Sequence, residues 1–265
     1  MKFVVCVKLT PDTEELNEVR PEDVGADDLG VTMVLNPWDE FAVEEALQLQ
    51  ERFEGETVAV TVGGEDATDA LKRAVAMGIE EAVLLSDPAF AGSDAWGTAR
   101  ILAEAIKGLG EYGLILTGKQ SVDGNSGLVA PGLAVKLGVP FVSQVARVVD
   151  LTDSSVTVVR ALDEGRQTVR VKLPAVISVS KEINEPRYPN FMGIRKASRM
   201  KYPVMAAADL PGLDTGQIGV DAALVKWTDL HKPPARGGTC EFITGETTAA
   251  LVAALVDKLV ADKVV

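Results

Sequence analysis

The alternation of short apolar segments with longer amphipathic ones constrains the fold of this chain more than any other feature. The strand-like segments are 3–7, 57–62, 82–85 and 114–117. The segments with apolar side chains at helical spacing begin at Asn36, near Ala67, at Asp94 and after Ser126. Strands joined by helices run parallel, and helices then cover both faces of the sheet. We therefore predict an α/β, Rossmann-like fold with a mostly parallel sheet.

The pattern changes near residue 144, where strand-like segments follow one another without room for helices. These segments are 145–149, 156–161, 168–171 and 176–179. Turn-forming residues separate them, so we predict an added region of antiparallel hairpins. A basic segment interrupted by prolines follows, then a stretch rich in glycine, proline and aspartate, and finally an amphipathic helix near residues 247–260. We predict an α/β domain over residues 1–205, which includes a recognition loop over residues 184–205, and an irregular C-terminal extension over residues 206–265.

A helix start is predicted where an asparagine precedes a proline and acidic residues. Asn36 can cap this helix, and Pro37 suits its first turn because the missing N–H costs nothing there. Asp39 faces the positive end of the helix dipole. Trp38 suits either the core or a position facing a ligand. Residues 11–29, upstream of this helix, are polar and predict a surface loop.

Charge and composition exclude several classes of function. Lys and Arg total 26 against 39 Asp and Glu, and the net charge of −13 opposes binding to nucleic acid or to an anionic membrane. The single histidine, His231, argues against a Ser–His–Asp hydrolase, a Cys–His protease and a polyhistidine metal site. Cys6 and Cys240 lack the spacing of a metal or disulfide motif. No apolar stretch approaches the ~20 residues that cross a bilayer, so we expect a soluble, cytoplasmic protein without a metal site.

Two familiar nucleotide motifs are missing from the positions where they would act. The turn after the first expected strand lacks the glycines of a dinucleotide fingerprint, which argues against an NAD-dependent dehydrogenase. Gly113 and Lys119 have the spacing of the phosphate-binding loop of NTPases, but the residues between them belong to an expected strand. Gln120 also replaces the Ser or Thr that would hold magnesium. We therefore predict neither class.

A loop rich in glycine and serine follows the fourth expected strand and leads into a helix. Ligands bind at this end of the strands in open α/β sheets, and a helix N-terminus offers free N–H groups to a phosphate. The same composition suits an ordinary loop between a strand and a helix, so both interpretations stay open at this point. The loop consists of Gly118, Lys119, Gln120, Ser121, Val122, Asp123, Gly124, Asn125, Ser126 and Gly127.

A locally basic segment, residues 181–201, is unusual in such an acidic chain. It also carries apolar side chains that a solvated run of charges would not need. An apolar anchor ringed by charges is typical of a docking loop, and a loop with few local contacts should be mobile. The alternative is that Phe191 and Ile194 fold back onto the core. The basic residues are Lys181, Arg187, Arg195, Lys196, Arg199 and Lys201, and the apolar ones are Tyr188, Phe191, Met192 and Ile194.

Several motifs occur together in the order that one known family shows. The longest motif runs from Val158 to Ser178 and contains Asp163-Glu164-Gly165-Arg166-Gln167, with Pro174 before an apolar strand. The shorter ones are Asn36-Pro37 with Ala42-Val43-Glu44-Glu45-Ala46, then Ala76-Met77-Gly78, Gly118-Lys119-Gln120 and Asn184-Glu185-Pro186-Arg187-Tyr188. Through these motifs the chain, from Met1 to about Lys201, resembles the β subunit of electron-transfer flavoproteins.

The resemblance implies a heterodimer with an α subunit, which carries electrons from soluble dehydrogenases, such as acyl-CoA dehydrogenases, to a membrane quinone oxidoreductase. The α subunit then holds most of the FAD, and this subunit holds a structural AMP and has no catalytic residues of its own. The implied AMP contacts are Cys6, Asn36, Pro37, Trp38, Asp39, Val62 and the loop from Gly118 to Gly127. The implied partner contacts are Arg187, Tyr188, Phe191, Ile194, Arg195, Lys196 and Arg199.

Two departures from the family pattern bear on the nucleotide. Cys6 stands where a small residue such as alanine is common. The loop keeps Asp123-Gly124 but lacks the Thr-Ala-Gln of members that bind a second FAD at this site, so AMP is favoured and a second FAD is the alternative. A stand-alone nucleotide-binding domain of the stress type is the rival from another class. The stripe of Leu251, Leu255 and Leu259 on the last helix is expected to pack either on its own domain or on the α subunit.

Overall fold

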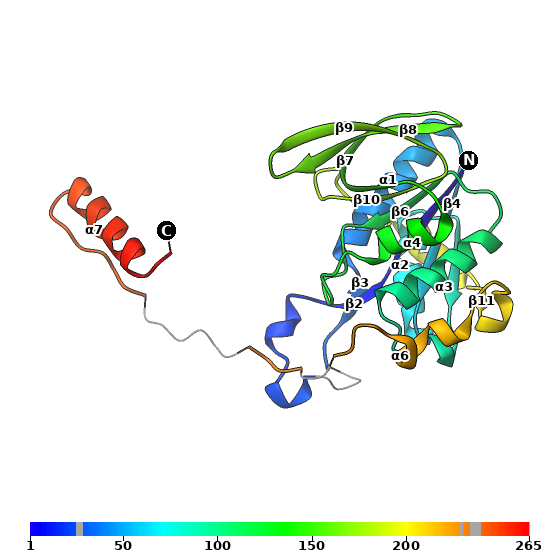
Figure 1. The fold of residues 1–265 in the computed structure, drawn as a ribbon, viewed down its shortest axis with the longest axis horizontal. Helices are drawn as coiled ribbons and strands as arrows, with labels where there is room; N and C mark the ends of the chain where they lie inside the picture. The colour runs from blue at the N-terminus through cyan, green and yellow to red at the C-terminus, as the bar shows by residue number, and fades with distance from the viewer. Residues whose placement is uncertain (25–28, 228–229, 234–239, 265) are drawn as a thin grey trace. The chain divides into compact units, whose positions relative to one another are not determined.

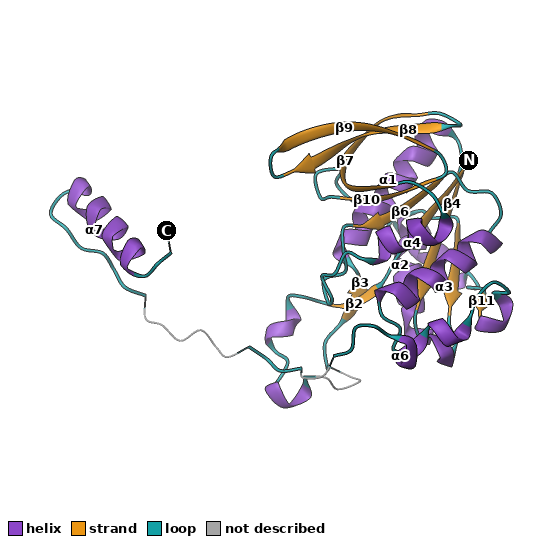
Figure 2. Cartoon of the chain, in the orientation of Figure 1, coloured by secondary structure: helices purple, strands orange, loops and turns teal. Residues whose placement is uncertain are grey.

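A 9-stranded sheet forms the centre of the computed structural model, which describes residues 1–24, 29–227, 230–233 and 240–264 (Figures 1 and 2). In spatial order the strands are β11 (Val204–Met205), β5 (Glu81–Leu85), β4 (Glu56–Val62), β1 (Lys2–Cys6), β6 (Leu114–Gly118), β10 (Ala175–Val179), β7 (Phe141–Leu151), β8 (Ser155–Leu162) and β9 (Gly165–Lys172). Neighbours from β11 to β7 are parallel, whereas β7, β8 and β9 pair antiparallel. The predicted mostly parallel sheet is confirmed.

Helices cover both faces of the parallel strands. α1 (Pro37–Phe53) and α2 (Thr68–Met77) pack on one face, and α3 (Ala95–Gly108) and α4 (Val129–Leu137) pack on the other. The helix ends follow local chemistry. Asp94 caps α3 by accepting the N–H groups of Trp96 and Gly97, and Gly138 ends α4 in the left-handed conformation that glycine adopts easily.

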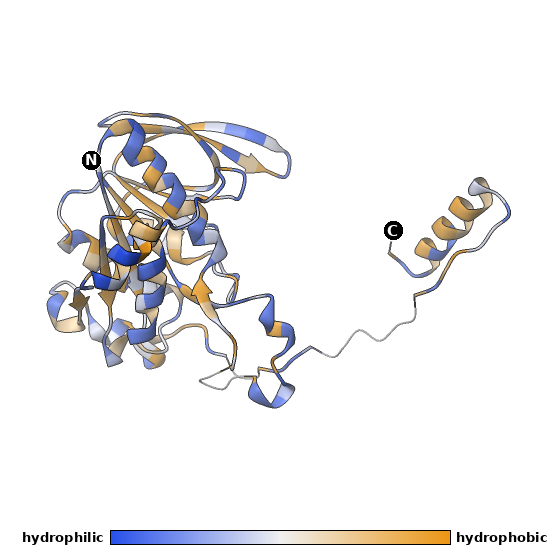
Figure 3. Cartoon of the chain, turned by 180° about the vertical axis from the view of Figure 1, so that it is seen from behind, coloured by the Kyte–Doolittle hydropathy of each residue, from blue (hydrophilic) through white to orange (hydrophobic). Residues whose placement is uncertain are grey.

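The strand β10 corrects the prediction that every segment after residue 144 forms a hairpin. β7, β8 and β9 form the expected antiparallel meander, but β10 lies between β6 and β7 and runs parallel to both. Every residue of β10 is buried, and all but Ser178 are apolar, a composition typical of a strand covered on both faces. The edge strand β9 is mostly exposed, and Figure 3 shows hydrophilic segments at this end of the sheet.

The predicted surface loop after the first strand is anchored at its base by a second, small sheet. β2 (Leu9–Pro11) pairs antiparallel with β3 (Met33–Leu35). Between them lie the short 3-10 helices η1 (Glu15–Asn17) and η2 (Pro21–Asp23). Residues 25–28 of the predicted loop lie outside the described part of the chain.

The basic segment contains a helix, α5 (Phe191–Arg199), where the sequence predicts a loop with few local contacts, and that prediction is wrong. The side chain of Asn190 caps α5 by accepting the N–H of Gly193 at 2.8 Å. Gly193 lies so close to α2 that an added Cβ would meet the carbonyl oxygen of Ala76. Ala197 is buried. Pro186 and Pro189 suggest an irregular segment, but both precede the helix, which begins at Phe191.

The described chain divides into two compact units, Met1–Leu230 and His231–Val265. The first unit extends beyond the boundary after residue 205 that the sequence predicts, and it includes η5 (Ala207–Asp209), η6 (Thr215–Gln217) and α6 (Gly219–Ala222). The second contains α7 (Thr248–Ala261), close to the predicted range and capped by Thr247. No helix within the described residues is long and apolar enough to cross a membrane.

The substitution Gly193→Ala should weaken the packing of α5 on α2. Alanine in place of glycine ordinarily stabilises a helix by up to about 1 kcal/mol, but here the new Cβ meets the Ala76 carbonyl. We expect the free energy of unfolding, measured by urea denaturation, to fall by about 1–3 kcal/mol. Ser198→Ala on the exposed side of the same helix is the control and should change it by less than about 0.5 kcal/mol. A stabilised Gly193→Ala protein would contradict the close approach.

Candidate functional site

The site lies at the carboxyl ends of β1 and β6, where the strand order reverses. From β1 the chain continues to β4 and β5 on one side and then returns to form β6 on the other side of β1. The helices that follow the two strands, α1 and α4, pack on opposite faces of the sheet. A crevice therefore forms between the strand ends, and ligands of open α/β sheets bind in such a crevice.

A buried carboxyl group, that of Asp39 in the first turn of α1, joins the two strand ends. Its Oδ2 accepts the N–H of Lys8 at 2.9 Å, and its Oδ1 accepts the N–H of Gly118 at 3.2 Å. Burial raises the pKa of Asp39 to about 7, although these hydrogen bonds oppose the rise. A Cβ at Gly118 would collide with Asp39 and with the backbone of Trp38. The glycine thus permits the contact that fixes α1 to both strands.

The loop after β6 is held by the side chain of Asn36. Its Nδ2 donates to the carbonyl oxygen of Gln120 at 2.9 Å, and its Oδ1 accepts the N–H of Val122 at 3.2 Å. The sequence predicts Asn36 as the cap of α1, but its side chain makes no capping bond there. Both the nitrogen and the oxygen of the side-chain amide instead form hydrogen bonds with the loop. Gly127, with a φ of 61°, takes the left-handed conformation that lets the chain turn into α4.

The first turn of α4 presents uncapped N–H groups to this crevice. The residue before the helix, Leu128, supplies no side-chain cap. Unpaired N–H groups and the positive end of the helix dipole together favour an anion. Two lysines border the same space: the Lys8 ammonium pairs with Asp123 at 2.5 Å, and the Lys119 ammonium lies 5.7 Å from the centre of the Trp38 ring. The arrangement suits a phosphate group.

A cavity of about 860 Å³ opens over the strand ends, a volume typical of sites for nucleotides and other mid-sized ligands. The predicted residues that line it are Cys6, Asn36, Asp39, Val62, Gly118, Lys119, Gln120, Ser121, Gly124, Ser126 and Gly127. The predicted residues that the structure places outside the lining are Pro37, Trp38, Val122, Asp123 and Asn125. Of these, Trp38 packs against Phe41, Asp123 pairs with Lys8, and Asn125 accepts a hydrogen bond from the Gln120 side chain. The sequence therefore indicates the part of the lining that comes from the ends of β1, β4 and β6, the start of α1 and the loop after β6, here called the inner half of the cavity.

The outer half of the cavity is missed by the sequence reasoning. Ser86 follows β5, Trp96 begins α3, and Val225 and Trp227 come from the chain after α6. The end of β5 could have indicated Ser86, since ligands bind at the carboxyl ends of parallel strands. No local signal predicts Val225 and Trp227, because only the long-range path of the chain brings them to this cavity.

The thiol of Cys6 is packed rather than reactive. Burial, and to a smaller extent the neighbouring Asp39, raise the pKa of Cys6 to about 12. Cys6 therefore remains a thiol at neutral pH, and it is unreactive because the thiolate is the reactive form. Within the described ranges, no group of three or more His, Cys, Asp and Glu residues is placed to hold a metal ion.

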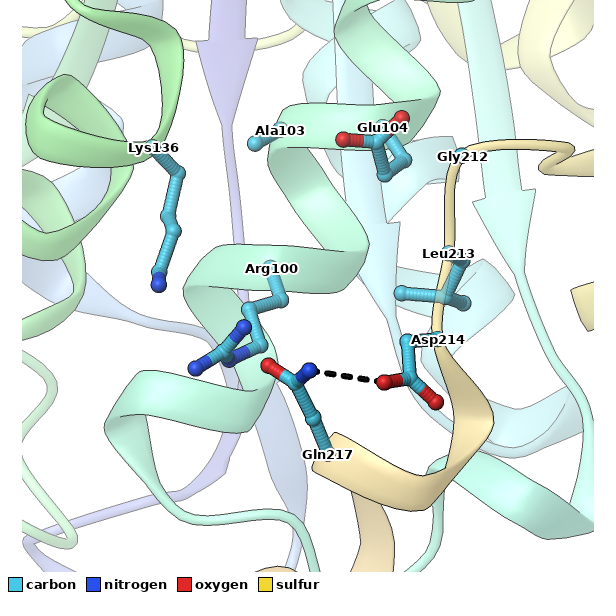
Figure 4. Close-up of a pocket in the computed structure, with 8 residues that line it drawn as sticks. All are labelled: Arg100, Ala103, Glu104, Lys136, Gly212, Leu213, Asp214 and Gln217. Atoms are coloured by element: carbon cyan, nitrogen blue, oxygen red, sulfur yellow. Dashed lines mark hydrogen bonds between the residues drawn. The ribbon is translucent and has the colours of Figure 1, made fainter.

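A second, smaller cavity of about 160 Å³ lies among α3, α4 and the chain around η6 (Figure 4). Arg100 and Lys136 reach toward it from the helices, and the Gln217 side chain donates to Asp214 at 2.7 Å. Its volume falls below the roughly 300 Å³ of the smaller ligand pockets. The nucleotide-sized space is therefore the one at the strand ends.

The predicted partner-binding residues divide into anchored and exposed groups. Arg187 pairs with Glu44 and Glu51, each at 2.7 Å, and these hydrogen-bonded pairs raise the pKa of its guanidinium. Lys196 donates to the carbonyl oxygen of Ile79 at 3.2 Å. Phe191 is 78% exposed, which contradicts the alternative that it folds back onto the core. The exposed group consists of Tyr188, Phe191, Ile194, Arg195 and Arg199.

The substitution Asp39→Asn should destabilise the fold, because the new amide nitrogen would face the N–H of Lys8, which is part-buried, or that of Gly118, which is buried, and the N–H that it faces can then no longer donate. An unsatisfied donor of this kind costs about 1–3 kcal/mol. The pKa of Asp39 is about 7 when folded against 3.8 in the ordinary state. The stability that its bound proton contributes is therefore complete below about pH 4 and is lost as the pH rises toward 7.

We accordingly expect the deficit of Asp39→Asn in unfolding free energy to be largest near pH 4 and to shrink toward pH 7, as measured by urea denaturation at each pH. Asp153→Asn, at an exposed turn, is the control and should show no such trend. A deficit that grows with rising pH would mean that Asp39 is ionised in the folded protein at low pH.

The chain matches known proteins along its whole length. Residues 25–210 match the family model of the electron transfer flavoprotein domain. The chain is 34% identical to the electron transfer flavoprotein subunit beta of Megasphaera elsdenii, over 100% of both chains. It is 35% identical to the caffeyl-CoA reductase-Etf complex subunit CarD of Acetobacterium woodii, over 98% of each chain. It is 34% identical to protein FixA of Bradyrhizobium diazoefficiens, over 98% of this chain and 91% of the relative. The resemblance that the motifs predict is thus confirmed, and the chain belongs to the family of electron transfer flavoprotein β subunits.

Proposed function

We propose that the chain is the β subunit of a cytoplasmic heterodimer that accepts electrons from soluble dehydrogenases, such as acyl-CoA dehydrogenases, and passes them to the respiratory chain through a membrane quinone oxidoreductase. An FAD held mainly by the α subunit supplies the redox chemistry. The observation that carries this proposal is the nucleotide-sized cavity at the strand ends, in a chain of this family. Cys6, the cysteine that lines the cavity, remains protonated, so the cavity suits binding rather than nucleophilic catalysis. The redox step then belongs to the cofactor.

The nucleotide that we propose for the cavity is AMP. Its phosphate would bind backbone N–H groups within residues 124–127, where the N–H of Asn125 already donates to the Ser121 carbonyl, and the uncapped first turn of α4, where the helix dipole favours an anion. Its adenine would lie near Asn36 and Val62, which line the inner half of the cavity. The net charge of −13 opposes a phosphate only weakly, because solvent screens charges beyond roughly 10 Å while the amide groups act at contact.

A second FAD in place of AMP is the alternative that one observation favours. The cavity does not end at the phosphate loop but continues past Phe90 and Trp96 to Trp227. This outer, aromatic part leaves room for a ligand longer than a mononucleotide. One relative is named as a subunit of a caffeyl-CoA reductase-Etf complex. By analogy, this chain would act in a complex with one dedicated reductase.

Extraction of the nucleotide distinguishes these alternatives. The chain is co-expressed with its α subunit, the heterodimer is denatured with acid, and the released nucleotides are quantified by chromatography. We expect one AMP and one FAD per heterodimer. Two FAD and no AMP would favour the alternative, and a stable monomer that does not associate with the α subunit would favour the stand-alone nucleotide-binding domain.

We propose α5 as the site that docks the dehydrogenase. Phe191 and Ile194 are exposed apolar groups on a helix that is itself anchored through Gly193 and Lys196. An exposed apolar anchor on a rigid support, beside Arg195 and Arg199, is suited to an interface with an acidic rim. The stripe on α7 is proposed to pack on the α subunit or on its own domain. It belongs to the second unit.

The substitution Phe191→Ala should weaken docking by about 2 kcal/mol, the scale of an interface hot spot. We expect dehydrogenase-driven reduction of the flavin to slow severalfold, with unchanged melting temperature, flavin content and reduction by dithionite. Phe242→Ala is the matched control, since Phe242 is equally exposed but lies in the second unit. Loss of stability or flavin with unchanged dehydrogenase kinetics would show that Phe191 has a structural role. Arg195→Ala should chiefly slow association, and less so at high salt.

A further inference from the structure

Residues 223–227, which follow α6, border the open side of the large cavity. Val225 and Trp227 line the cavity, yet 61% and 72% of their surfaces are exposed. Trp96 lines it from the first turn of α3. In Figure 1 this segment follows α6 at the end of the sheet where the parallel strands finish. Apolar side chains thus gather where a bound ligand would meet solvent.

A single carboxylate, that of Asp94, connects this segment to α3. Its Oδ1 accepts the N–H groups of Trp96 and Gly97, each at 2.9 Å, and so caps the helix. Its Oδ2 accepts the N–H groups of Leu224 at 2.8 Å and Val225 at 3.3 Å. Burial opposes ionisation of Asp94, but these four backbone hydrogen bonds hold its pKa below the ordinary value. The charged oxygen therefore makes charge-assisted bonds to the segment.

We propose that residues 223–227 form a strap that closes the nucleotide-binding cavity, with Asp94 as the positioning residue that holds the strap and Trp227 as a residue that contacts the bound nucleotide. This inference rests on the proposed function, in which a nucleotide occupies the cavity. The indole of Trp227 offers a flat apolar face and a polar edge to the part of the nucleotide at the cavity mouth. Among the described residues, the hydrogen bonds of Leu224 and Val225 to Asp94 are the ones that hold the strap, so it can open without unfolding the sheet.

The substitution Asp94→Ser separates the two roles of Asp94. Serine is a good helix cap, so α3 is retained, but its one short hydroxyl cannot also serve Leu224 and Val225. Asp214→Ser is the matched control. Asp214 likewise accepts a helical N–H, that of Gly216 in η6, and it lines only the small cavity (Figure 4). Trp227→Ala removes the proposed contact itself, and Trp227→Phe keeps an aromatic ring there.

The measurement is the dissociation rate of nucleotide from the heterodimer, which is loaded with radiolabelled AMP or, in parallel, with FAD and chased with an excess of the unlabelled compound. We expect Asp94→Ser and Trp227→Ala each to raise the dissociation rate about tenfold, the effect of losing bonds or contacts worth roughly 1.4 kcal/mol. Trp227→Phe should restore most of the slow release. Asp214→Ser should release nucleotide at the wild-type rate, and all four variants should melt close to the wild type.

Three outcomes would overturn the inference, and they are distinct. Wild-type release rates in Asp94→Ser and Trp227→Ala would show that the strap does not close the cavity, while nucleotide binding itself stands. Variants that fail to associate with the α subunit, with unchanged release from the part that does, would make the strap a subunit contact. A wild-type heterodimer that retains neither AMP nor FAD would refute the proposed function first, and the strap's role with it.

Discussion

The hydrogen bonds of Asp39 are the interaction on which the site depends. β1 and β6 are adjacent strands, and the helices that follow them, α1 and α4, pack on opposite faces of the sheet. The two chain segments therefore separate beyond the strand ends. Asp39 binds a backbone N–H from the residues after β1 and another from the end of β6, and it carries α1 with it. Asn36, three residues earlier, then fixes the loop that follows β6. A few side chains at the start of one helix thus determine the shape of the inner cavity.

The first parallel strands and their helices could be predicted from sequence because their patterns are local. Apolar runs of strand length alternate with helical periodicity, and Asp94 and Gly78 mark helix ends by their own chemistry. The place of β10 could not be predicted in this way. No local pattern near residues 175–179 predicts that the chain leaves the hairpins to lie beside β6, although a strand in which only Ser178 is polar indicates burial on both faces.

The site was predictable to the extent that it depends on one strand end and one loop. Asn36 lines the cavity, but its side chain bonds the loop after β6 instead of capping α1. An amide can bond a nearby N–H or a distant loop, and only the fold selects between them. Asp94 meets the segment after α6 only through the fold, since it bonds the N–H groups of Leu224 and Val225, which lie far from it in sequence. α5 was missed because the prolines before it resemble a loop, whereas Gly193 and Ala197 make it a packed helix.

The position of β10 also sets the order in which the sheet can be completed. β6 is buried along its whole length and pairs with β1 on one side and β10 on the other. Between β6 and β10 the chain forms α4 and the entire meander β7–β8–β9. On the ribosome, one edge of the central strand therefore stays open, with its backbone groups unpaired, until Val179 has been synthesised. During that interval the nascent chain presents an apolar strand edge at which it can misassociate and which chaperones can shield.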